Sequence, residues 1–599
     1  MKLLRLKITD PDGFRSLPCG FEHHFRTEWN LQDELAQAND FAPFVCAGPN
    51  GSGKSNLLEV LAAIFFQLEV LRVRRSFLPE ALQDEAQEVS PVSYELEYLI
   101  KLPKEYRSFG SPTFAHVVVI KEAGGSPWLR WENHEAFASE GFASSRLTDE
   151  ERDLLLPQYV LGYSSGENEI LSLPFFKMRF VQFDEYWHAL TRQLSYPGHP
   201  ETRLAYLDSG FSQAILLCNL LFQDEATLQP FREDVGIEAL REFRIILRRS
   251  IELRPEQLAA FTSEDENARQ SLEDIVKSNP ALHAEIGELG NTRYRLNLLQ
   301  LLEGDEKSSL VVSALKRCAT LSYIDDASDA LVLDYWVNEA TQQAFRENFD
   351  GSALVLFQAF QVLLALNLYA VNEVLKTDLY TSTSHYVSET VPTLPSDQRI
   401  MRFKFVRFTK QGVAEPMMLK QLSDGEHQLL HSLGLCLLFR ETNSLFLLDE
   451  PETHFNPDWR ANFITRLRQC LPGDGEYAQE MLITTHTPFL ISDSKPDKVL
   501  VFNKDRASGA VSISNPNFNT LGASINKITM SEIFNKRETI GGHAQAILDD
   551  LRKRFETGSE EKEALITEIQ QQLGDSVEKL LLIKAILDGD KSDNGEAQD

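Results

Sequence analysis

A glycine-rich run near the start of the chain has the residue types and spacing of a ligand-binding loop. Residues 48–55 read Gly-Pro-Asn-Gly-Ser-Gly-Lys-Ser, which fits the pattern of a phosphate-binding P-loop. An apolar run at 44–47 predicts a strand before it, and residues 56–64 predict a helix after it. Backbone N–H groups and a helix N-terminus would then surround phosphates, and Ser55 would bind Mg²⁺. The residues predicted to contact the nucleotide are Asn50, Gly51, Ser52, Gly53 and Lys54.

A pair of acidic residues follows an apolar run about 400 residues further along the chain. Residues 445–450 read Leu-Phe-Leu-Leu-Asp-Glu, typical of a buried parallel strand that ends in carboxylates. Because the carboxyl ends of parallel strands share one edge of a sheet, we expect these acids to lie beside the P-loop. Asp449 would then bind Mg²⁺, and Glu450 would orient and polarise the attacking water.

A serine and a glycine open the helix that precedes this strand. Residues 422–426 read Leu-Ser-Asp-Gly-Glu, and residues 427–439 predict a helix. Ser423 and Gly425 would bind phosphate at the helix N-terminus, although the same pattern also fits a plain N-cap. Placed ahead of the acidic strand, the motif is an ABC-type signature, which serves the nucleotide of a facing protomer. We therefore predict a dimer that encloses ATP between its two heads.

A histidine and a glutamine complete the predicted site. His486 ends an apolar run at 481–486 and would sense the γ-phosphate, the alternative being a histidine that caps a loop. Residues 452–457 would cross the dimer interface. Gln158 and Gln182 are both candidates for a glutamine that contacts Mg²⁺ and the attacking water, and we favour Gln158.

Composition limits the class of protein. The 599 residues are 43% apolar, as in a folded domain, and the net charge of −30 argues against a generally basic nucleic-acid-binding surface. A local basic groove is still possible. The six cysteines form no C-x-x-C pair, so a zinc site is not expected. We find no apolar run of about 18 residues and no signal-peptide core, which predicts a cytoplasmic protein without a membrane span.

The fold predicted from these patterns is α/β, with a mixed sheet, flanking helices, a large helical insertion and a C-terminal helical segment. The predicted divisions are an N-terminal ATPase lobe at 1–222, a mostly helical insertion at 223–399, a C-terminal ATPase lobe at 400–505, and a helical segment with an acidic tail at 506–599. The first lobe would hold the P-loop and the candidate glutamine. The second would hold the signature, the acidic strand and the histidine.

Four arginines recur with helical spacing inside the predicted insertion. They are Arg241, Arg244, Arg248 and Arg249. On a helix they would share one face. We favour a solvated face, with Glu238 and Glu242 nearby, over a contact for nucleic acid or a partner.

The order of these motifs resembles the ABC-type ATPases of the SMC, RecF and OLD group. The run Phe-Arg-Ser at 14–16 is similar to the N-terminal turn of that group. Residues 163–168 and 521–524 resemble restriction-system-associated ATPases and the PtuA family of Septu and retron anti-phage systems. The resemblance implies an ATPase with ATP and Mg²⁺ as cofactors. It also implies a homodimer or higher oligomer through ATP-sandwiched heads.

The PtuA resemblance further implies a regulatory subunit that controls a partner nuclease. That partner would be an HNH protein called PtuB, joined in retron versions by a reverse transcriptase with its multicopy single-stranded DNA. One alternative is a RecF- or SMC-like ATPase of DNA repair or maintenance. Another is an OLD-like nuclease acting alone, but OLD nucleases continue into a Toprim domain with an Asp-x-Asp pair. Residues 588–590 imitate that pair without a matching strand ahead of them, so we expect no nuclease in this chain.

Overall fold

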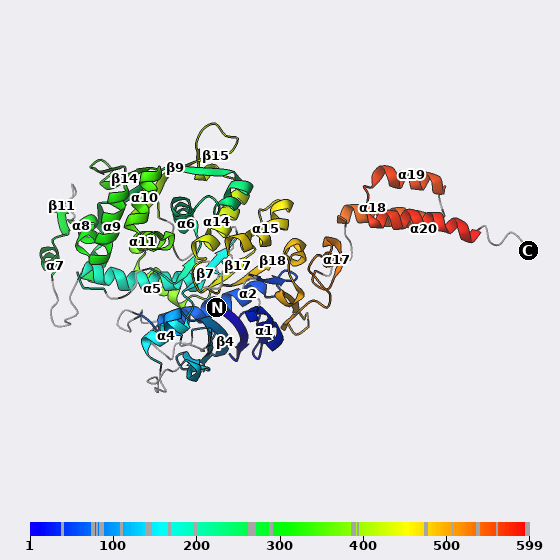
Figure 1. The fold of residues 1–599 in the computed structure, drawn as a ribbon, viewed down its shortest axis with the longest axis horizontal. Helices are drawn as coiled ribbons and strands as arrows, with labels where there is room; N and C mark the ends of the chain where they lie inside the picture. The colour runs from blue at the N-terminus through cyan, green and yellow to red at the C-terminus, as the bar shows by residue number, and fades with distance from the viewer. Residues whose placement is uncertain are drawn as a thin grey trace, which may run out of the picture. The chain divides into compact units, whose positions relative to one another are not determined.

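The computed structural model divides into two compact units, Met1–Leu521 and Gly522–Asp599, which are described separately (Figure 1). The residues that the structure describes are 1–36, 41–73, 78, 82, 89–107, 112–137, 147–165, 169, 171–196, 198, 201–261, 271–286, 292–384, 391, 394–471, 477–505, 507–534, 540–558 and 561–593.

A seven-stranded sheet lies at the centre of the first unit, in the order β20-β19-β3-β18-β17-β7-β8. Its strands are β3 (Phe44–Ala47), β7 (Tyr159–Ser164), β8 (Leu204–Tyr206), β17 (Ser444–Asp449), β18 (Glu480–Thr485), β19 (Val499–Lys504) and β20 (Val511–Ser514). All neighbours are parallel except β19 and β20. The predicted lobes at 1–222 and 400–505 therefore contribute strands to one sheet. The predicted α/β fold with a mixed sheet is confirmed.

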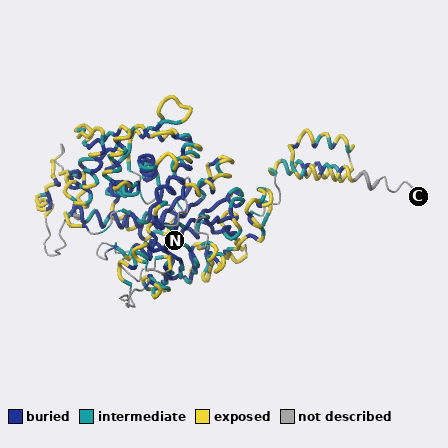
Figure 2. Tube along the Cα trace, viewed as in Figure 1, coloured by how far each residue is buried: buried dark blue, intermediate teal, exposed yellow. Residues whose placement is uncertain are grey.

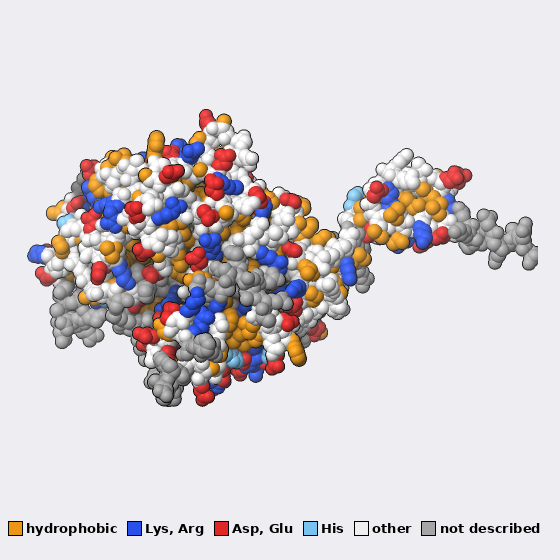
Figure 3. Space-filling model, viewed as in Figure 1, with side chains coloured by type: hydrophobic (Ala, Val, Ile, Leu, Met, Phe, Trp, Pro, Cys, Tyr) orange, Lys and Arg blue, Asp and Glu red, His pale blue; other side chains and the backbone are white. Residues whose placement is uncertain are grey.

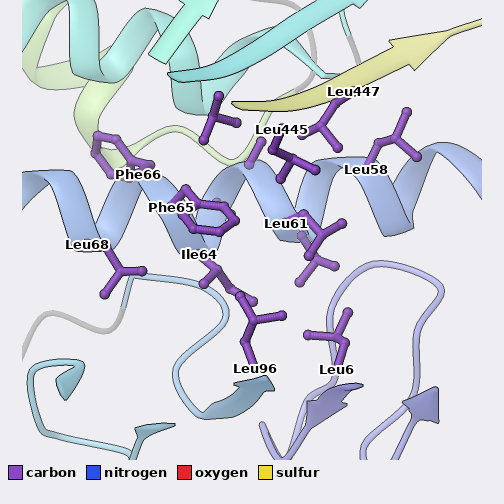
Figure 4. Packing of buried hydrophobic residues seen from close by; sticks show 14 of the residues in the cluster. Leu6, Leu58, Leu61, Ile64, Phe65, Phe66, Leu68, Leu96, Leu445 and Leu447 are labelled. Atoms are coloured by element: carbon purple, nitrogen blue, oxygen red, sulfur yellow. The ribbon is translucent and has the colours of Figure 1, made fainter. Parts of the chain in front are cut away.

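A second, antiparallel sheet has the order β2-β1-β4-β5-β6. Its strands are β1 (Lys2–Ile8), β2 (Glu22–His24), β4 (Tyr94–Lys101), β5 (Phe114–Lys121) and β6 (Trp128–Trp131). Helix α2 (Lys54–Val70) packs between the two sheets, with Leu6 and Leu96 on one side and Leu445 and Leu447 on the other (Figure 4). Because α2 is apolar around most of its surface, it is stable only in such a buried position.

Further helices cover the central sheet and the acidic strand. They are α1 (Glu28–Ala36), α4 (Asp149–Leu155), α5 (Ser172–Thr191), α6 (Ser209–Phe222), α14 (Asp424–Leu438), α15 (Pro457–Cys470) and α16 (Pro488–Ser492). The most buried part of the trace runs through this central region, whereas exposed residues follow its outer helices and loops (Figure 2). The carboxyl ends of the parallel strands are thus held by a continuous hydrophobic core.

The middle of the chain contains strands as well as helices, so the prediction of a mostly helical insertion at 223–399 was wrong for residues 237–336. A five-stranded antiparallel sheet has the order β13-β14-β9-β15-β16, and a three-stranded sheet has the order β10-β12-β11. Their strands are β9 (Ile237–Arg248), β10 (Ser250–Leu253), β11 (Leu282–Ile286), β12 (Thr292–Asn297), β13 (Leu321–Asp325), β14 (Ala330–Trp336), β15 (Met401–Lys410) and β16 (Met417–Met418). The helices here are α7 (Leu272–Ser278), α8 (Leu298–Gly304), α9 (Glu306–Cys318), α10 (Glu339–Asn348), α11 (Ala353–Ala365) and α12 (Glu373–Thr381).

Three of the four arginines, Arg241, Arg244 and Arg248, lie on strand β9 and not on a helix, and Arg249 follows this strand. Phe243, Ile245 and Leu247 are buried at alternate positions, which is the period of a strand with one covered face. Arg244 and Arg248 lie on the other face. The arginine spacing matched a helical period by coincidence. The prediction of a helix used that spacing and did not consider the apolar alternation beside it.

One helical stretch, Ala353–Ala370, is long and apolar enough to cross a membrane by length and composition alone. The sequence predicted a long apolar helix at 354–375 that belongs to the core, and no membrane span. Half of this stretch is buried in the structure, and its first part, α11, packs on α6 and β15. A buried core helix meets the same criteria, so the finding is weak evidence for a membrane span.

The second unit is helical, as the predicted fold requires. Its helices are α17 (Ile525–Met530), α18 (Gly542–Thr557), α19 (Lys562–Gln572) and α20 (Val577–Asp593). The last three share a small core of their own that includes Leu551, Ile569 and Ile586. Hydrophobic side chains also gather on part of the visible surface of this unit (Figure 3).

Candidate nucleotide-binding site

The P-loop connects the end of β3 to the start of α2, as predicted. Gly53 has φ +97°, and a Cβ there would lie 2.7 Å from Ser16 Oγ. A Cβ on Gly48 would lie 2.6 Å from the carbonyl oxygen of Phe502. Both positions therefore require glycine, because the loop passes close to neighbouring atoms with a backbone conformation that other residues rarely adopt. Asn50, Gly51 and Ser52 lie in the same loop.

Lys54 begins α2 and is buried, with 5% of its surface exposed. Its Nζ donates to the carbonyl oxygens of Gly48 and Pro49, both at 3.2 Å. Burial lowers the pKa of Lys54, and the carboxylates of Glu450 and Asp449 act against that shift. A desolvated ammonium group that bonds only to loop carbonyls within the described structure gains much from an added anion, because the interior screens charge poorly.

Asp449 ends β17 directly beside the P-loop helix. Ser55 Oγ donates to Asp449 Oδ1 at 2.7 Å, and Thr484 Oγ1 donates to the same oxygen at 2.6 Å. Asp449 is 1% exposed, and burial raises its pKa although both hydroxyl donors lower it. The expectation that the two distant motifs meet at one sheet edge is confirmed by this contact between Ser55 and Asp449.

Glu450 follows with a left-handed backbone conformation, φ +50°. Its backbone N–H donates to Thr484 Oγ1 at 3.0 Å, and its Oε1 lies 3.1 Å from His486 Nε2. The hydrogen bond with His486 lowers the pKa of Glu450, so the carboxyl group is ionised near neutral pH. A non-glycine residue with positive φ costs free energy, and such strain gathers at functional sites. Here it turns the Glu450 carboxylate from the buried strand toward the partly exposed His486.

The oxygen atoms at this edge suit a hard divalent cation. Ser55 and Asp449 offer a hydroxyl and a carboxylate, which are ligand types that Mg²⁺ accepts. Within the described ranges, no three or more His, Cys, Asp or Glu side chains form a group that could hold a metal ion by themselves. Mg²⁺ commonly takes one or two protein ligands and completes its shell with water and substrate phosphates. The residues therefore fit a magnesium ion that binds together with a nucleotide.

Ser423 and Gly425 lie at the start of α14, next to the loop that follows β17. Ser423 is the N-cap of α14 and forms a capping box with Glu426. A Cβ on Gly425 would lie 2.7 Å from the carbonyl oxygen of His454. Gln428, one turn into the helix, accepts a hydrogen bond from the N–H of His454 at 2.8 Å. The start of α14 thus packs on the 450–455 loop, and Ser423 is exposed.

The structure contradicts the prediction that Gln158 is a metal ligand. Gln158 precedes β7, at the amino end of a parallel strand, whereas the P-loop and Asp449 lie at the carboxyl ends. Its Oε1 accepts a hydrogen bond from Asn443 N at 2.7 Å, and its own N–H donates to Asn443 O at 2.8 Å. A six-residue strand separates the two ends by about 20 Å. The other candidate, Gln182, is buried in the middle of α5.

Hydroxyl residues at the nucleotide edge were missed by sequence reasoning. Ser165 follows β7, where its N–H donates to Asp449 O at 3.1 Å and its Oγ lies 3.1 Å from Thr453 Oγ1. Thr484 bonds to Asp449, as described above. A usable signal existed, because both residues lie at the ends of apolar runs that become parallel strands on either side of β17. The remainder of the predicted 163–168 motif, residues 166–168, lies outside the described residues.

Glu452 is a further residue near this edge, which the sequence indicated only as the start of the predicted interface segment 452–457. It is 3% exposed, and Thr485 Oγ1 donates to its Oε1. Within the described structure its Oε2 has no hydrogen-bond partner. Burial raises the pKa of Glu452 to about 7. The loop after the acidic strand therefore holds a carboxyl group that changes charge near neutral pH.

Known proteins resemble this chain over part of its sequence and, weakly, in structure. Residues 240–492 match a protein-family model described as "AAA domain, putative AbiEii toxin, Type IV TA system". A search of curated protein sequences gives no match. A solved structure of the recombination mediator protein RecF has 12% identity and a TM-score of 0.30, covering 85% of this chain and 97% of that one. The SMC head domain from Thermotoga maritima has 11% identity and a TM-score of 0.27, covering 86% and 100%.

The matched residues include the signature, the acidic strand and His486, and they meet the P-loop through Ser55 and Asp449. The fold and the site together define an α/β protein with a P-loop nucleotide-binding site.

Proposed function

We propose that this chain binds ATP with Mg²⁺, hydrolyses it slowly, and acts as the regulatory subunit of a PtuA-like anti-phage defence system. In this role it would control a partner nuclease such as an HNH protein. The observation that carries the ATPase part is the 2.7 Å hydrogen bond between Ser55 and Asp449, two residues from opposite ends of the chain. A P-loop and a strand-end carboxylate in direct contact are the parts that a Mg-nucleotide site requires.

The roles follow from the geometry of the chain's own residues. The buried Lys54 ammonium group would leave its loop carbonyls for phosphate oxygens, and Ser55 and Asp449 would hold the metal ion. Bound Mg²⁺ would supply positive charge to the phosphates of the nucleotide. Glu450, ionised and held by His486, would orient a water and accept its proton.

A second protomer is proposed because, among the described residues, Ser423 hydrogen-bonds to Glu426 and not to the P-loop of its own chain. Ser423 is exposed at the start of α14, and that helix packs on the 450–455 loop. Two heads arranged head to tail would bring each Ser423 to the other chain's nucleotide. The proposed assembly is thus a homodimer, or a higher oligomer built from it, that closes around two ATP molecules.

The defence role is supported by the resemblance of the motifs to PtuA and by the name of the matched family model, which refers to a toxin of a toxin–antitoxin system. We propose a cytoplasmic location for this complex. In a retron version, the reverse transcriptase and its multicopy single-stranded DNA would also belong to it. Nuclease activity is proposed to reside in the partner and not in this chain.

The ATPase proposal is tested with Glu450→Gln, which keeps the shape of the side chain and removes its charge. We expect the variant to retain ATP binding, to hydrolyse ATP about 10²- to 10³-fold more slowly, and to accumulate as an ATP-bound dimer. Turnover is measured by phosphate release, and the dimer by light scattering with and without Mg-ATP. Glu441→Gln, which changes an exposed acid ahead of β17, is the control. Hydrolysis at the wild-type rate by Glu450→Gln would remove its proposed role.

The defence proposal needs a separate experiment, because an ATPase of any cellular role would pass the first one. The tagged Glu450→Gln chain is purified from its native host, and bound proteins and nucleic acids are identified. An HNH nuclease that is present with Glu450→Gln and reduced with Lys54→Ala supports ATP-dependent control of a nuclease. Chromosomal DNA with repair proteins would instead favour a RecF- or SMC-like role. Metal-dependent nicking by the chain alone would favour an OLD-like nuclease.

A further inference from the structure

The five-stranded sheet β13-β14-β9-β15-β16 has one covered face and one open face. On the covered face, Phe243 stacks on Tyr335 with ring centroids 4.4 Å apart, and Phe403 meets Phe360 of α11. The strand register assigns the side chains of the opposite face. There Asp334 pairs with Arg244, and Lys404 pairs with the same arginine from the other side. We call this opposite side the outer face.

The outer face carries more positive than negative charge, although the whole chain has a net charge of −30. By strand register its cations are Arg244, Arg248, Arg402, Lys404 and Arg407, and its carboxylates are Glu242, Asp325 and Asp334. Arg244 forms two hydrogen bonds with Asp334, at 2.6 and 2.8 Å, and Arg407 bonds to Glu242. These two arginines are therefore already paired.

The other cations of this face have neutral partners. Arg402 donates to the carbonyl oxygen of Ser396, and Arg248 bonds to the hydroxyl of Tyr369. Among the described residues, neither has a carboxylate within 4.0 Å, and the same holds for Lys404. Burial lowers the pKa of Arg402, and the nearby charges of Arg248 and Arg399 lower it further, while Asp397 acts against them. Cations crowded in this way gain from an added polyanion.

A strained bulge places an aromatic ring among these charges. The register of β15 against β9 shifts between Lys404 and Arg407, and Phe405 within the shift has φ +54°. Its ring lies 5.5 Å from the guanidinium of Arg244, 5.1 Å from Lys404 Nζ and 5.9 Å from the guanidinium of Arg407. The ring is 40% exposed. Bulges of this kind re-aim side chains, and here the result is an exposed ring with cations around it.

Two more exposed aromatic side chains lie on the outer face. Trp336 is 67% exposed and borders the same depression as Phe405, and Tyr323 on β13 is 39% exposed. Covering large exposed aromatic side chains is favourable, and a group of them on one face is typical of a surface that binds a partner. Strands β9, β14 and β15 can be followed in Figure 1 along one border of the first unit.

We propose that the outer face binds single-stranded nucleic acid. Arg248, Arg402 and Lys404 would contact phosphates, and unpaired bases would stack on Phe405 and Trp336. Aromatic rings can stack on the bases of a nucleotide, and the surrounding cations can bind its phosphates. Because bases inside a duplex are already stacked and paired, such a surface favours a single strand. The rest of the chain repels a polyanion, so the contact would be confined to this surface. The binding is independent of the proposed ATP site, because none of these residues belongs to it.

The test measures the anisotropy of a fluorescein-labelled oligothymidylate of about 20 nucleotides, long enough for such a surface. The full chain is titrated without ATP. Lys404→Glu removes a phosphate contact, and Phe405→Gly removes the ring while glycine accepts the positive φ. We expect each variant to bind about 5- to 20-fold more weakly, since one stacked base or one phosphate contact is lost. Lys404→Glu should also reduce the slope of log affinity against log salt by about 0.7.

Lys277→Glu is the matched control, because it makes the same charge change on an exposed lysine of α7. It should bind within about twofold of wild type, since only net charge changes. Lys54→Ala should also bind normally, which separates this proposal from the ATPase. Circular dichroism and thermal midpoints confirm that each variant is folded. The proposal is overturned by an absence of binding in the wild type, by stronger binding of a duplex of equal length, or by equal losses in Lys277→Glu.

Discussion

The two ends of the seven-stranded sheet are both polar and both buried, but they differ in how their polar groups are satisfied. At the carboxyl end, Lys54 bonds to loop carbonyls, and Asp449 bonds to two hydroxyl groups. At the amino end, Arg26 and Glu480 bond to each other at 2.6 and 3.0 Å. The amino end is a closed set of opposite charges. The carboxyl end differs, because the buried Lys54 ammonium group donates to backbone carbonyls of the loop and Asp449 accepts from hydroxyl groups.

The pKa shifts report the same difference. Burial alone would raise the pKa of Glu480, but Arg26 outweighs it and the pKa is lowered. Burial also raises the pKa of Asp449, and there the hydroxyl donors do not reverse the shift. A buried charge is therefore no sign of a site by itself. What distinguishes the nucleotide end is a buried lysine that donates to backbone carbonyls, so that its charge is available to an anionic ligand.

The largest expected effect comes from Lys54→Ala at the carboxyl end. We expect ATP affinity to fall at least about 100-fold, because the phosphates lose their buried cation. The thermal midpoint should stay constant or rise slightly, since burial opposes the Lys54 charge. Titration calorimetry and thermal unfolding measure the two quantities. The matched control is Lys498→Ala at the amino end, a lysine that is 5% exposed and bonds to Glu34. It should leave ATP affinity unchanged, and a loss of affinity as large as that of Lys54→Ala would break the comparison.

Glu480→Ala should cost stability without changing nucleotide chemistry. Arg26 would stay buried and keep Glu34 but lose its two hydrogen bonds to Glu480, and breaking a buried charge pair costs about 3 kcal/mol. Because the folded pKa of Glu480 is lowered, its contribution is present above its unfolded pKa and is lost as pH falls through the folded value. Unfolding is followed by circular dichroism at pH 7 and in acid. A variant as stable as wild type at pH 7 would show that the Arg26–Glu480 pair does not stabilise the amino end of the sheet.

Glu452→Gln sharpens the comparison within the carboxyl end. The pKa of Glu452 in the folded protein is raised to about 7, above its ordinary value. Ionisation of Glu452 therefore lowers the free energy of unfolding of wild type as pH rises from the unfolded pKa through 7. The variant has no such charge. We expect it to gain up to about 3 kcal/mol relative to wild type between pH 4.5 and 8. Thermal midpoints of both proteins at several pH values measure the gain. A difference that does not vary with pH would mean that Glu452 is ionised throughout.

The smallest expected effect is that of Gln158→Ala. The variant loses the side-chain bond to Asn443 N and should be less stable by about 1 kcal/mol. Its ATPase rate should stay within about twofold of wild type, because the side chain lies at the far end of β7. Steady-state phosphate release and thermal unfolding are measured together, with Ser55→Ala as the variant that should lose activity. A large loss of ATPase activity in Gln158→Ala would show that Gln158 belongs to the nucleotide site.

Patterns with strict local requirements were predicted correctly. The P-loop could be recognised because its glycines and its lysine must occur in a fixed order for a backbone to enclose phosphates. Asp449 and Glu450 could be recognised because carboxylates directly after an apolar strand have few other uses. Their meeting through Ser55 followed from the rule that parallel strands end at one edge.

Other assignments depended on positions and contacts that exist only in the folded structure. Gln158 matched a residue type but lay before its strand, and no local pattern fixed which end of β7 it would occupy. The arginines of β9 repeated with a helical period, while the apolar residues beside them alternated with the period of a strand. Glu452 looked like one more acid in a loop, and only packing of that loop on β18 made it buried.

The glycine-rich loop and the acidic strand could be recognised from the amino-acid sequence alone, because each needs particular residues at particular spacings. The folded structure was needed to show which polar residues share an edge, which buried charges are paired, and that Phe405 is exposed among cations on a sheet. The physical reason is that spacing along the chain controls local backbone geometry. Burial and pairing of charges depend instead on segments hundreds of residues apart, which meet only when the core forms.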